Sequence, residues 1–89
     1  MIAREIIVKG KVQGVFYRAS AKEKADELGL FGWVKNSAEG TVEIWVEGVD
    51  RLVLEMTEWC WQGPARARVD DVEVKAVDPE GYLDFKVIR

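Results

Sequence analysis

The order in which two hydrophobic periodicities alternate constrains the fold of this chain more than any other feature. Five segments alternate apolar and polar residues as half-buried strands do: 4–12, 31–37, 41–47, 69–77 and a shorter one at 83–87. Two segments between them carry apolar residues at helical spacing: 18–28, and a stretch that starts at Asp50 and stops at Gly63-Pro64. The sequence therefore predicts strand, helix, strand, strand, helix, strand, and then a short terminal strand.

Local signals support these boundaries. Gly29 is the expected residue after the first helix, and Asp50 is expected to cap the start of the second. The turn residues at 38–40 predict a hairpin between the second and third strands. This order defines an α+β split βαβ sandwich of the ferredoxin-like type, an antiparallel sheet with two helices on one face. The length of 89 residues predicts a single domain over residues 1–89.

Composition narrows the function. The net charge of −3 argues against nucleic-acid binding, which needs a basic face. The chain has no long apolar run and no signal-peptide pattern, and its one cysteine cannot form an internal disulfide, so we expect a cytoplasmic protein that does not enter membranes. Cys60 falls on the apolar stripe of the second helix, which favours packing over thiol chemistry. No His and no ligand cluster are present, so no metal site is predicted.

The segment GKVQGVFYR, residues 10–18, connects the first strand to the first helix. Glycines let the backbone N–H groups of such a loop converge on one point, and a helix start adds a positive dipole end. Arg18 could place two N–H donors on two phosphate oxygens. The loop thus favours a small anion, although the two glycines could also form a simple turn with Arg18 as a solvated charge. Its spacing excludes a Walker A motif and a dinucleotide fingerprint.

A second segment, GWVKNSAEGTVEIWVEG at residues 32–48, changes that balance. The two segments together resemble the paired signatures of the acylphosphatase family. The first signature is matched by Gly10, Lys11, Val12, Gln13, Gly14, Val15, Tyr17 and Arg18. The second is matched by Gly32, Trp33, Val34, Lys35, Asn36, Gly40, Val42 and Gly48. The resemblance extends over nearly the whole chain, including Gly63-Pro64.

The resemblance implies hydrolysis of the carboxyl–phosphate anhydride of small acyl phosphates, without a cofactor. Acetyl phosphate, carbamoyl phosphate and 1,3-bisphosphoglycerate are the candidate substrates, and inorganic phosphate is both product and competitive inhibitor. Arg18 and Asn36 are the implied catalytic residues, and Asn36 orients the attacking water. The implied phosphate binders are Arg18 and the loop amides of Gln13, Gly14, Val15, Phe16 and Tyr17. Nothing in the sequence indicates more than a monomer.

This chemistry is consistent with a chain that lacks histidine. The leaving carboxylate is a weak base that needs no proton, and a loose phosphoryl-transfer transition state gains little from a strong base on the water. Positioning and charge stabilisation remain, and amides with one guanidinium can supply both. The side chain of Asn36 can accept from a water and donate to an oxygen without titrating. By itself, however, Asn36 could equally be a residue that caps the strand end.

Two other classes share the predicted fold. An RNA-recognition module is the first, because residues 31–34 fit part of its RNP1 pattern. Gly29 and Leu30 stand where that pattern needs a basic residue and a glycine, and Asn36 stands where it needs an aromatic one. The second class, a metal-binding or regulatory domain, would normally need Cys and His ligands. Fold alone does not separate these readings from the hydrolase, and the loop with Asn36 favours the hydrolase.

Overall fold

The computed structural model describes every residue from Met1 to Arg89, and its elements follow the predicted order. The elements are β1 (Ile2–Lys11), α1 (Tyr17–Leu28), β2 (Phe31–Asn36), β3 (Val42–Gly48), α2 (Asp50–Gln62), β4 (Arg68–Val77) and β5 (Phe85–Ile88). Most predicted boundaries agree with these within two residues. Neither helix has the length and hydropathy that a membrane crossing requires.

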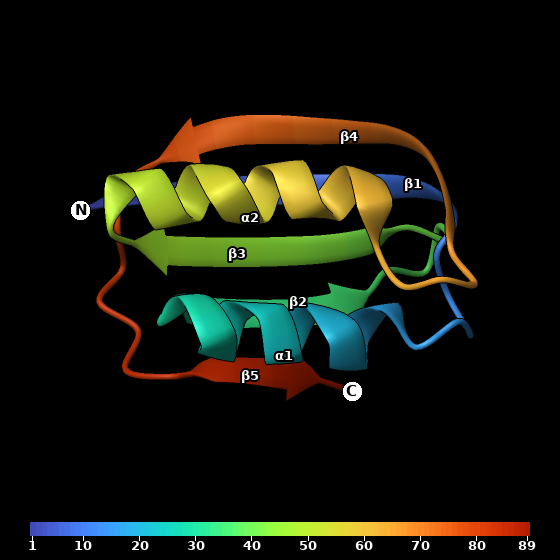
Figure 1. The fold of residues 1–89 in the computed structure, drawn as a ribbon, viewed down its shortest axis with the longest axis horizontal. Helices are drawn as coiled ribbons and strands as arrows, with labels where there is room; N and C mark the ends of the chain where they lie inside the picture. The colour runs from blue at the N-terminus through green and yellow to red at the C-terminus, as the bar shows by residue number, and fades with distance from the viewer.

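The five strands form one sheet in the order β4-β1-β3-β2-β5. The four main strands are antiparallel, as predicted: β1 pairs with both β3 and β4, and β2 pairs with β3. The terminal strand β5 is the exception, because it runs parallel to β2 and makes the sheet mixed. Its direction follows from the connection after β4, which crosses the end of the sheet and enters β5 from the same side as β2 (Figure 1).

Both helices cover the same face of the sheet (Figure 1), and the core lies between these two layers. The strands contribute alternating side chains such as Ile6, Val34 and Ile44, all fully buried. Helix α1 contributes small alanines, and α2 contributes larger side chains that include Cys60. Burial raises the pKa of the Cys60 thiol to about 12, although the hydroxyl of Tyr17 opposes this shift. Cys60 is fully buried in the core, so the packing role predicted for this cysteine is confirmed.

The start of α2 differs from the prediction. Asp50 is the first helical residue, and the capping position belongs to Val49, whose backbone is extended and whose carbonyl accepts from the N–H groups of Leu52 and Val53. The Asp50 carboxylate instead forms an ion pair with the amino group of Met1 at 3.1 Å. An acidic residue in the first turn still complements the positive end of the helix dipole.

Helix α1 is fastened to α2 at its first residue. Tyr17 is 1% exposed, its hydroxyl donates to the carbonyl oxygen of Cys60 at 2.7 Å, and its ring packs against that of Trp59 with centroids 5.4 Å apart. Burial raises the pKa of this hydroxyl well above its usual value. The buried anchor fixes the end of the preceding loop, and it leaves the next residue, Arg18, at the edge of the molecule.

Candidate functional site

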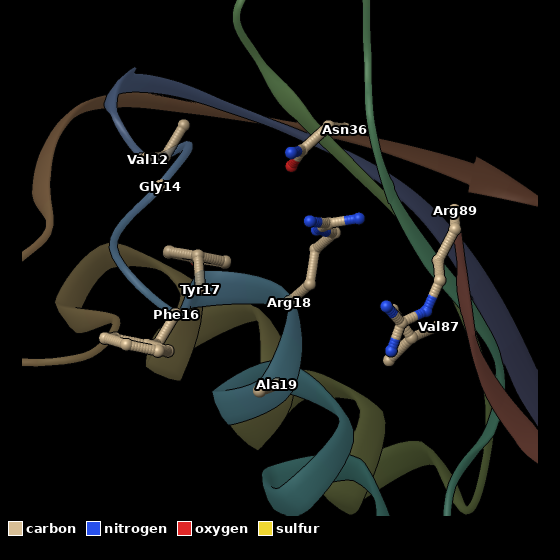
Figure 2. A pocket seen from close by; sticks show the side chains of 9 residues that line it. All are labelled: Val12, Gly14, Phe16, Tyr17, Arg18, Ala19, Asn36, Val87 and Arg89. Carbon is tan, nitrogen blue, oxygen red and sulfur yellow. The ribbon is translucent and has the colours of Figure 1, made fainter.

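A pocket of about 320 Å³ lies where the β1–α1 loop, the end of β2 and the end of β5 meet. Such a volume is at the lower end of those typical for small-molecule sites, roughly 300–1,000 Å³. Its lining residues are Val12, Gly14, Phe16, Tyr17, Arg18, Ala19, Asn36, Val87 and Arg89 (Figure 2). Arg18 and Asn36, predicted from two separate segments of the sequence, therefore line one pocket.

The backbone of the β1–α1 loop presents a row of unpaired donors. None of the N–H groups of residues 13–19 donates to a backbone or side-chain acceptor. The first bonded N–H after them is that of Ser20, which donates to the carbonyl of Phe16 at 3.0 Å. The early N–H groups of a helix have no partner within the helix, and here the loop before it adds more. These donors are available to bind an anion.

Two left-handed residues curl this loop. Gly14 has φ 73° and Phe16 has φ 66°, and Phe16 is the only non-glycine residue in the chain with positive φ. Left-handed and right-handed residues in close succession turn neighbouring N–H groups toward one point. A bulky residue in this conformation is strained by about 1–2 kcal/mol, and strain of this kind concentrates at functional sites. The Phe16 side chain is 70% exposed, so core packing does not explain its position.

The two glycines that frame the loop in the sequence have different roles. Nothing lies within 4 Å of a Cβ built on Gly14, so this position needs glycine for its conformation and not for space. A Cβ on Gly10 would collide with the carbonyl oxygen of Arg68. Gly10 lies where the pairing of β1 with β4 shifts register, so it belongs to the sheet and not to the pocket.

Arg18 is partly buried in the first turn of α1, and it has no carboxylate partner within ion-pair distance. No Asp or Glu lines the pocket. A guanidinium without a protein counter-ion, placed beside unpaired N–H groups, forms a locally positive site in a chain of net charge −3. Arg18 therefore lies where it can hold an anion, rather than as a solvated charge on an open surface.

Asn36 is the last residue of β2 and pairs with Val42 of β3. Its Oδ1 is shielded from solvent and accepts no hydrogen bond from the protein, the only buried side-chain oxygen or nitrogen with this property. Figure 2 shows its amide and the Arg18 guanidinium directed into the same pocket. A buried acceptor without a donor is costly, and in a native protein it calls for a specific explanation such as a catalytic role.

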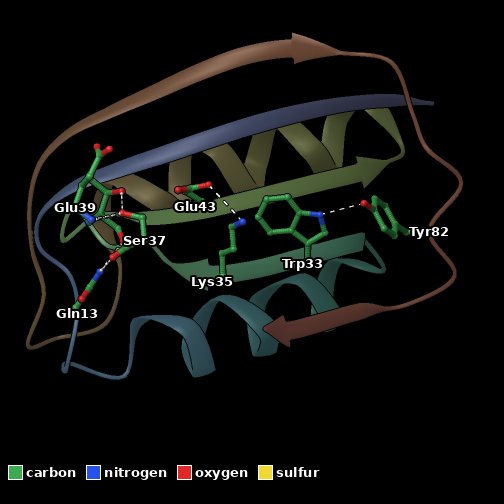
Figure 3. A network of polar contacts seen from close by, with 8 residues as sticks. Gln13, Trp33, Lys35, Ser37, Glu39, Glu43 and Tyr82 are labelled. Atoms are coloured by element: carbon green, nitrogen blue, oxygen red, sulfur yellow. Dashed lines mark hydrogen bonds and ion pairs between the residues drawn. The ribbon is translucent and has the colours of Figure 1, made fainter. Parts of the chain in front are cut away.

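The side chain of Gln13 connects the loop to the β2–β3 turn. Its Nε2 donates to the carbonyls of Ser37 at 2.8 Å and Thr41 at 2.9 Å (Figure 3). The Ser37 and Thr41 hydroxyls bond each other at 2.6 Å and complete the turn. The Gln13 side chain therefore holds the loop against the residues that follow Asn36. Only the backbone N–H of Gln13 is left for the predicted phosphate binding.

Three other predicted binders, Val15, Phe16 and Tyr17, can also contribute only through their backbone. Val15 and Tyr17 point their side chains into the core, at 5% and 1% exposure. The side chain of Phe16 is apolar and lies largely in solvent. The structure holds no group of three or more Cys, Asp or Glu residues arranged as metal ligands.

Val87 and Arg89 line the pocket but were not predicted from the sequence. Both follow from the pairing of β5 with β2, which aligns Val34 with Val87 and Lys35 with Ile88. Asn36 and Arg89 thus leave the same edge of the sheet side by side. The signal in the sequence is the alternation of side chains along a strand. Arg89 is two residues beyond Val87, so it shares the face of that apolar residue once β5 is placed next to β2.

Fold and site together define an α+β domain with a loop of unpaired N–H donors before its first helix. Comparison with known proteins then identifies the family. A sequence model of the acylphosphatase family matches residues 4–87. An acylphosphatase of Haloarcula marismortui is 49% identical over 82 residues, which cover 92% of this chain and 90% of that protein. The chain therefore belongs to the acylphosphatase family, and it is a hydrolase.

Solved structures agree with this assignment. The crystal structure of acylphosphatase from Bacillus subtilis is 36% identical in sequence and superposes with a TM-score of 0.97 over 100% of both chains. An acylphosphatase from Coxiella burnetii is 44% identical and superposes with a TM-score of 0.95 over 98% of this chain and 92% of that one. The family assignment favours the hydrolase over the RNA-binding and metal-binding alternatives that share the fold.

Proposed function

We propose that this pocket hydrolyses the carboxyl–phosphate anhydride bond of small acyl phosphates, releasing a carboxylate and inorganic phosphate. One observation carries the proposal: unpaired loop N–H groups, a guanidinium without a counter-ion and a buried acceptor without a donor meet in one pocket that no Asp or Glu side chain lines. This set suits a reaction that depends on charge stabilisation and positioning and not on proton transfer.

The phosphate is held by the backbone N–H groups of Gln13, Gly14, Val15, Phe16 and Tyr17 and by the Arg18 guanidinium. The guanidinium can contact two phosphate oxygens at once, and the N–H groups surround the rest of the group. In a loose transition state negative charge is spread over the three non-bridging phosphoryl oxygens, where these fixed donors can stabilise it. The strained loop conformation prepares them before substrate arrives.

Asn36 positions the attacking water. Its Oδ1 lacks a donor in the protein, and a water hydrogen can supply one. The water oxygen forms the new P–O bond as the bond from phosphorus to the acyl oxygen breaks, and the electron pair leaves with the carboxylate. The extra water proton passes to a phosphate oxygen or to solvent, so no enzyme base is required.

The proposal covers residues 1–89 as a single catalytic domain that acts as a monomer in the cytoplasm without metal or cofactor. The low molecular weight of an acyl phosphate fits a pocket of this size. Light scattering coupled to size-exclusion chromatography tests the monomer directly. A dimer with residues from both copies in the pocket would contradict it.

Phosphate release from benzoyl phosphate tests the reaction, with phenyl phosphate as the matched monoester control. We expect rapid release from the anhydride and almost none from the monoester, whose phenolate leaves much less readily than a carboxylate. Inorganic phosphate should inhibit competitively, because it occupies the same loop. Equal rates on the two substrates, or purely non-competitive inhibition by phosphate, would contradict the proposal.

A further inference from the structure

The pocket holds a second arginine that the proposed chemistry does not use. Arg89 directly follows β5 and lies beside Asn36 at one edge of the sheet, since Lys35 pairs with Ile88. Its side chain shares the helix-covered face with Val87, a partly buried residue that packs against the core. Figure 2 shows Arg18 and Arg89 on different elements around the same pocket, α1 and the end of β5.

Neither guanidinium has a counter-ion. No Asp or Glu lies within ion-pair distance of Arg18 or Arg89, and none lines the pocket. Two unpaired cations in one small pocket repel each other, and this is unexpected in a chain with more acidic than basic residues, 16 against 13. One arginine and the loop amides already suffice for a phosphate, so the second cation is available for another anionic group.

The position of β5 relative to α1 is fixed. Lys22 of α1 donates to the carbonyl of Phe85 at 3.0 Å, and its ion pair with Asp26 at 2.9 Å holds the ammonium in place. The helix that carries Arg18 and the strand that leads to Arg89 are thus linked directly. Val87 lies on this strand between that link and Arg89, and it supplies an apolar wall.

We infer that Arg89 is a specificity residue that binds an anionic group on the acyl half of the substrate. The favoured substrates are acyl phosphates whose acyl group ends in a carboxylate or a second phosphate. The carbon chain of such a substrate would lie along Val87, with its phosphoryl end at Arg18 and its far anion at Arg89. This inference rests on the proposed hydrolysis of acyl phosphates, and it deepens that proposal by assigning the acyl side of the pocket.

The test compares benzoyl phosphate with 3-carboxybenzoyl and 4-carboxybenzoyl phosphate, which share the reacting bond and differ in the far anion. We expect the wild-type protein to prefer at least one carboxylated substrate in kcat/KM. Arg89→Ala should lower kcat/KM for that substrate about three- to tenfold, because an exposed guanidinium–carboxylate contact is of modest strength. The loss should appear mainly in KM, since the contact is equal in the ground and transition states.

Benzoyl phosphate turnover by Arg89→Ala should stay within about twofold of wild type. Arg51→Ala is the matched control, because it removes the same charge from an exposed residue in the first turn of α2, outside the pocket. It should leave the substrate preference unchanged. Added salt should weaken the preference of the wild-type protein, since the contact is open to solvent.

The outcomes separate the two proposals. If the wild-type protein hydrolyses benzoyl phosphate but shows no preference for either carboxylated substrate, the role of Arg89 is wrong and the hydrolase remains. If Arg89→Ala lowers activity equally on all three substrates, Arg89 acts on the phosphate and the inference is overturned. If benzoyl phosphate itself is not hydrolysed, the proposed function is wrong, and the inference about Arg89 that rests on it is wrong as well.

Discussion

Each end of the sheet carries a loop with several backbone N–H groups that have no partner in a helix or strand, and the two loops differ in whether the protein supplies an acceptor. At one end, backbone N–H groups of the β4–β5 connection converge on a carboxylate of the protein: Glu47 accepts from the N–H groups of residues 80–82 at 2.8 Å each and from the Trp45 indole at 3.0 Å. At the other end, the N–H groups of residues 13–19 have no acceptor in the protein. Figure 1 places the β4–β5 connection and the β1–α1 loop at the two ends of the strands.

The difference between the two ends indicates what each loop does. Glu47 is only 1% exposed, and four donors satisfy its charge, so it fastens a surface loop and contributes to stability. The β1–α1 loop is curled by Gly14 and the strained Phe16 and is held by the Gln13 side chain, yet no Asp or Glu lines its pocket. The loop with its own anion is structural, whereas the role proposed for the β1–α1 loop is to bind an anion from solution.

Substitution of Arg18 should have the largest effect on activity, because no other cation beside the β1–α1 loop can replace its guanidinium. Arg18→Ala should lower kcat/KM for benzoyl phosphate by about 10³-fold or more, since it removes charge stabilisation aimed at the phosphoryl group. Arg18→Lys should restore little, because an ammonium lacks the planar two-point contact. Steady-state kinetics measures both variants. Wild-type turnover by Arg18→Lys would contradict the two-point contact.

The same variant should leave folding nearly unchanged. Arg18 has no ion pair to lose, so Arg18→Ala should alter the free energy of unfolding by less than about 0.5 kcal/mol, as is usual for surface substitutions. Urea denaturation measures this change. A large destabilisation would mean that the β1–α1 loop is a structural element like the Glu47 loop, and the contrast between the ends would disappear.

Asn36→Ala should lower kcat by about 10²-fold while KM changes little. The loop amides and Arg18 still bind the phosphate, whereas the contact to the attacking water, made in the transition state, is lost. Asn36→Asp should also fail, because it removes the amide donor and places a negative charge near the phosphate. Ser37→Ala, next in sequence and directed into the β2–β3 turn, is the control for local disturbance. If Asn36→Ala instead raised KM and left kcat unchanged, Asn36 would act in substrate binding and not in positioning the water.

At the opposite end, Glu47→Gln should destabilise the fold by about 2–3 kcal/mol and leave the kinetics of benzoyl phosphate hydrolysis nearly unchanged. The amide cannot accept all four donors, and its NH₂ group faces N–H groups that also donate. Thermal unfolding should show a loss of about 10 °C or more for a domain of this size. Glu43→Gln on the same strand breaks only a long contact with Lys35 at 3.9 Å, and it should cost less than about 0.5 kcal/mol.

The role of Glu47 could not be predicted from the sequence. It lies on a strand of alternating apolar and charged residues, VEIWVEG, and there it reads as one more solvent-facing acid. Its burial depends on the loop of residues 80–82, which is remote in sequence. The course of that loop also determines that β5 runs parallel to β2. A four-residue strand carries too weak a pattern to choose its own partner.

The main elements and the pocket residues Arg18 and Asn36 were predictable, because periodicity and two long motifs are local signals. The left-handed conformation of Phe16 was not, since an aromatic side chain argues against it. Arg89 was missed because its place depends on the β2–β5 pairing. The cap of α2 was misplaced by one residue, because the Asp50 carboxylate pairs with the Met1 amino group instead of the helix N–H groups.

The two ends should also differ in how stability responds to pH. Burial by itself would raise the pKa of Glu47, but hydrogen bonds from the Trp45 indole and from the N–H groups of residues 80–82 outweigh it and hold the pKa below its usual value. A carboxyl with a depressed folded-state pKa stabilises the fold above its unfolded pKa of about 4.3, and this contribution is lost as pH falls through the folded-state value. The urea concentration at the unfolding midpoint should therefore decrease in the wild-type protein as the pH is lowered below about 4. The decrease should be less steep in Glu47→Gln. If the urea midpoint depended on pH in the same way in both proteins, Glu47 would not be a source of the stability lost at low pH.

Catalysis at the β1–α1 loop should respond least to pH, since no Asp, Glu, His or Cys lines its pocket. Asn36 does not ionise, and no Asp or Glu side chain lines the pocket. Glu23 and Asp26 lie on the same helix as Arg18, and Glu39 lies in the turn after Asn36, but none of them is a pocket residue; Asp26 instead pairs with Lys22. The kcat for benzoyl phosphate should therefore be flat between about pH 5 and pH 8, apart from the titration of the substrate itself. A sharp fall with a midpoint near neutrality would mean that a carboxylate acts as a base, and substitution of these three acids by their amides would then identify it.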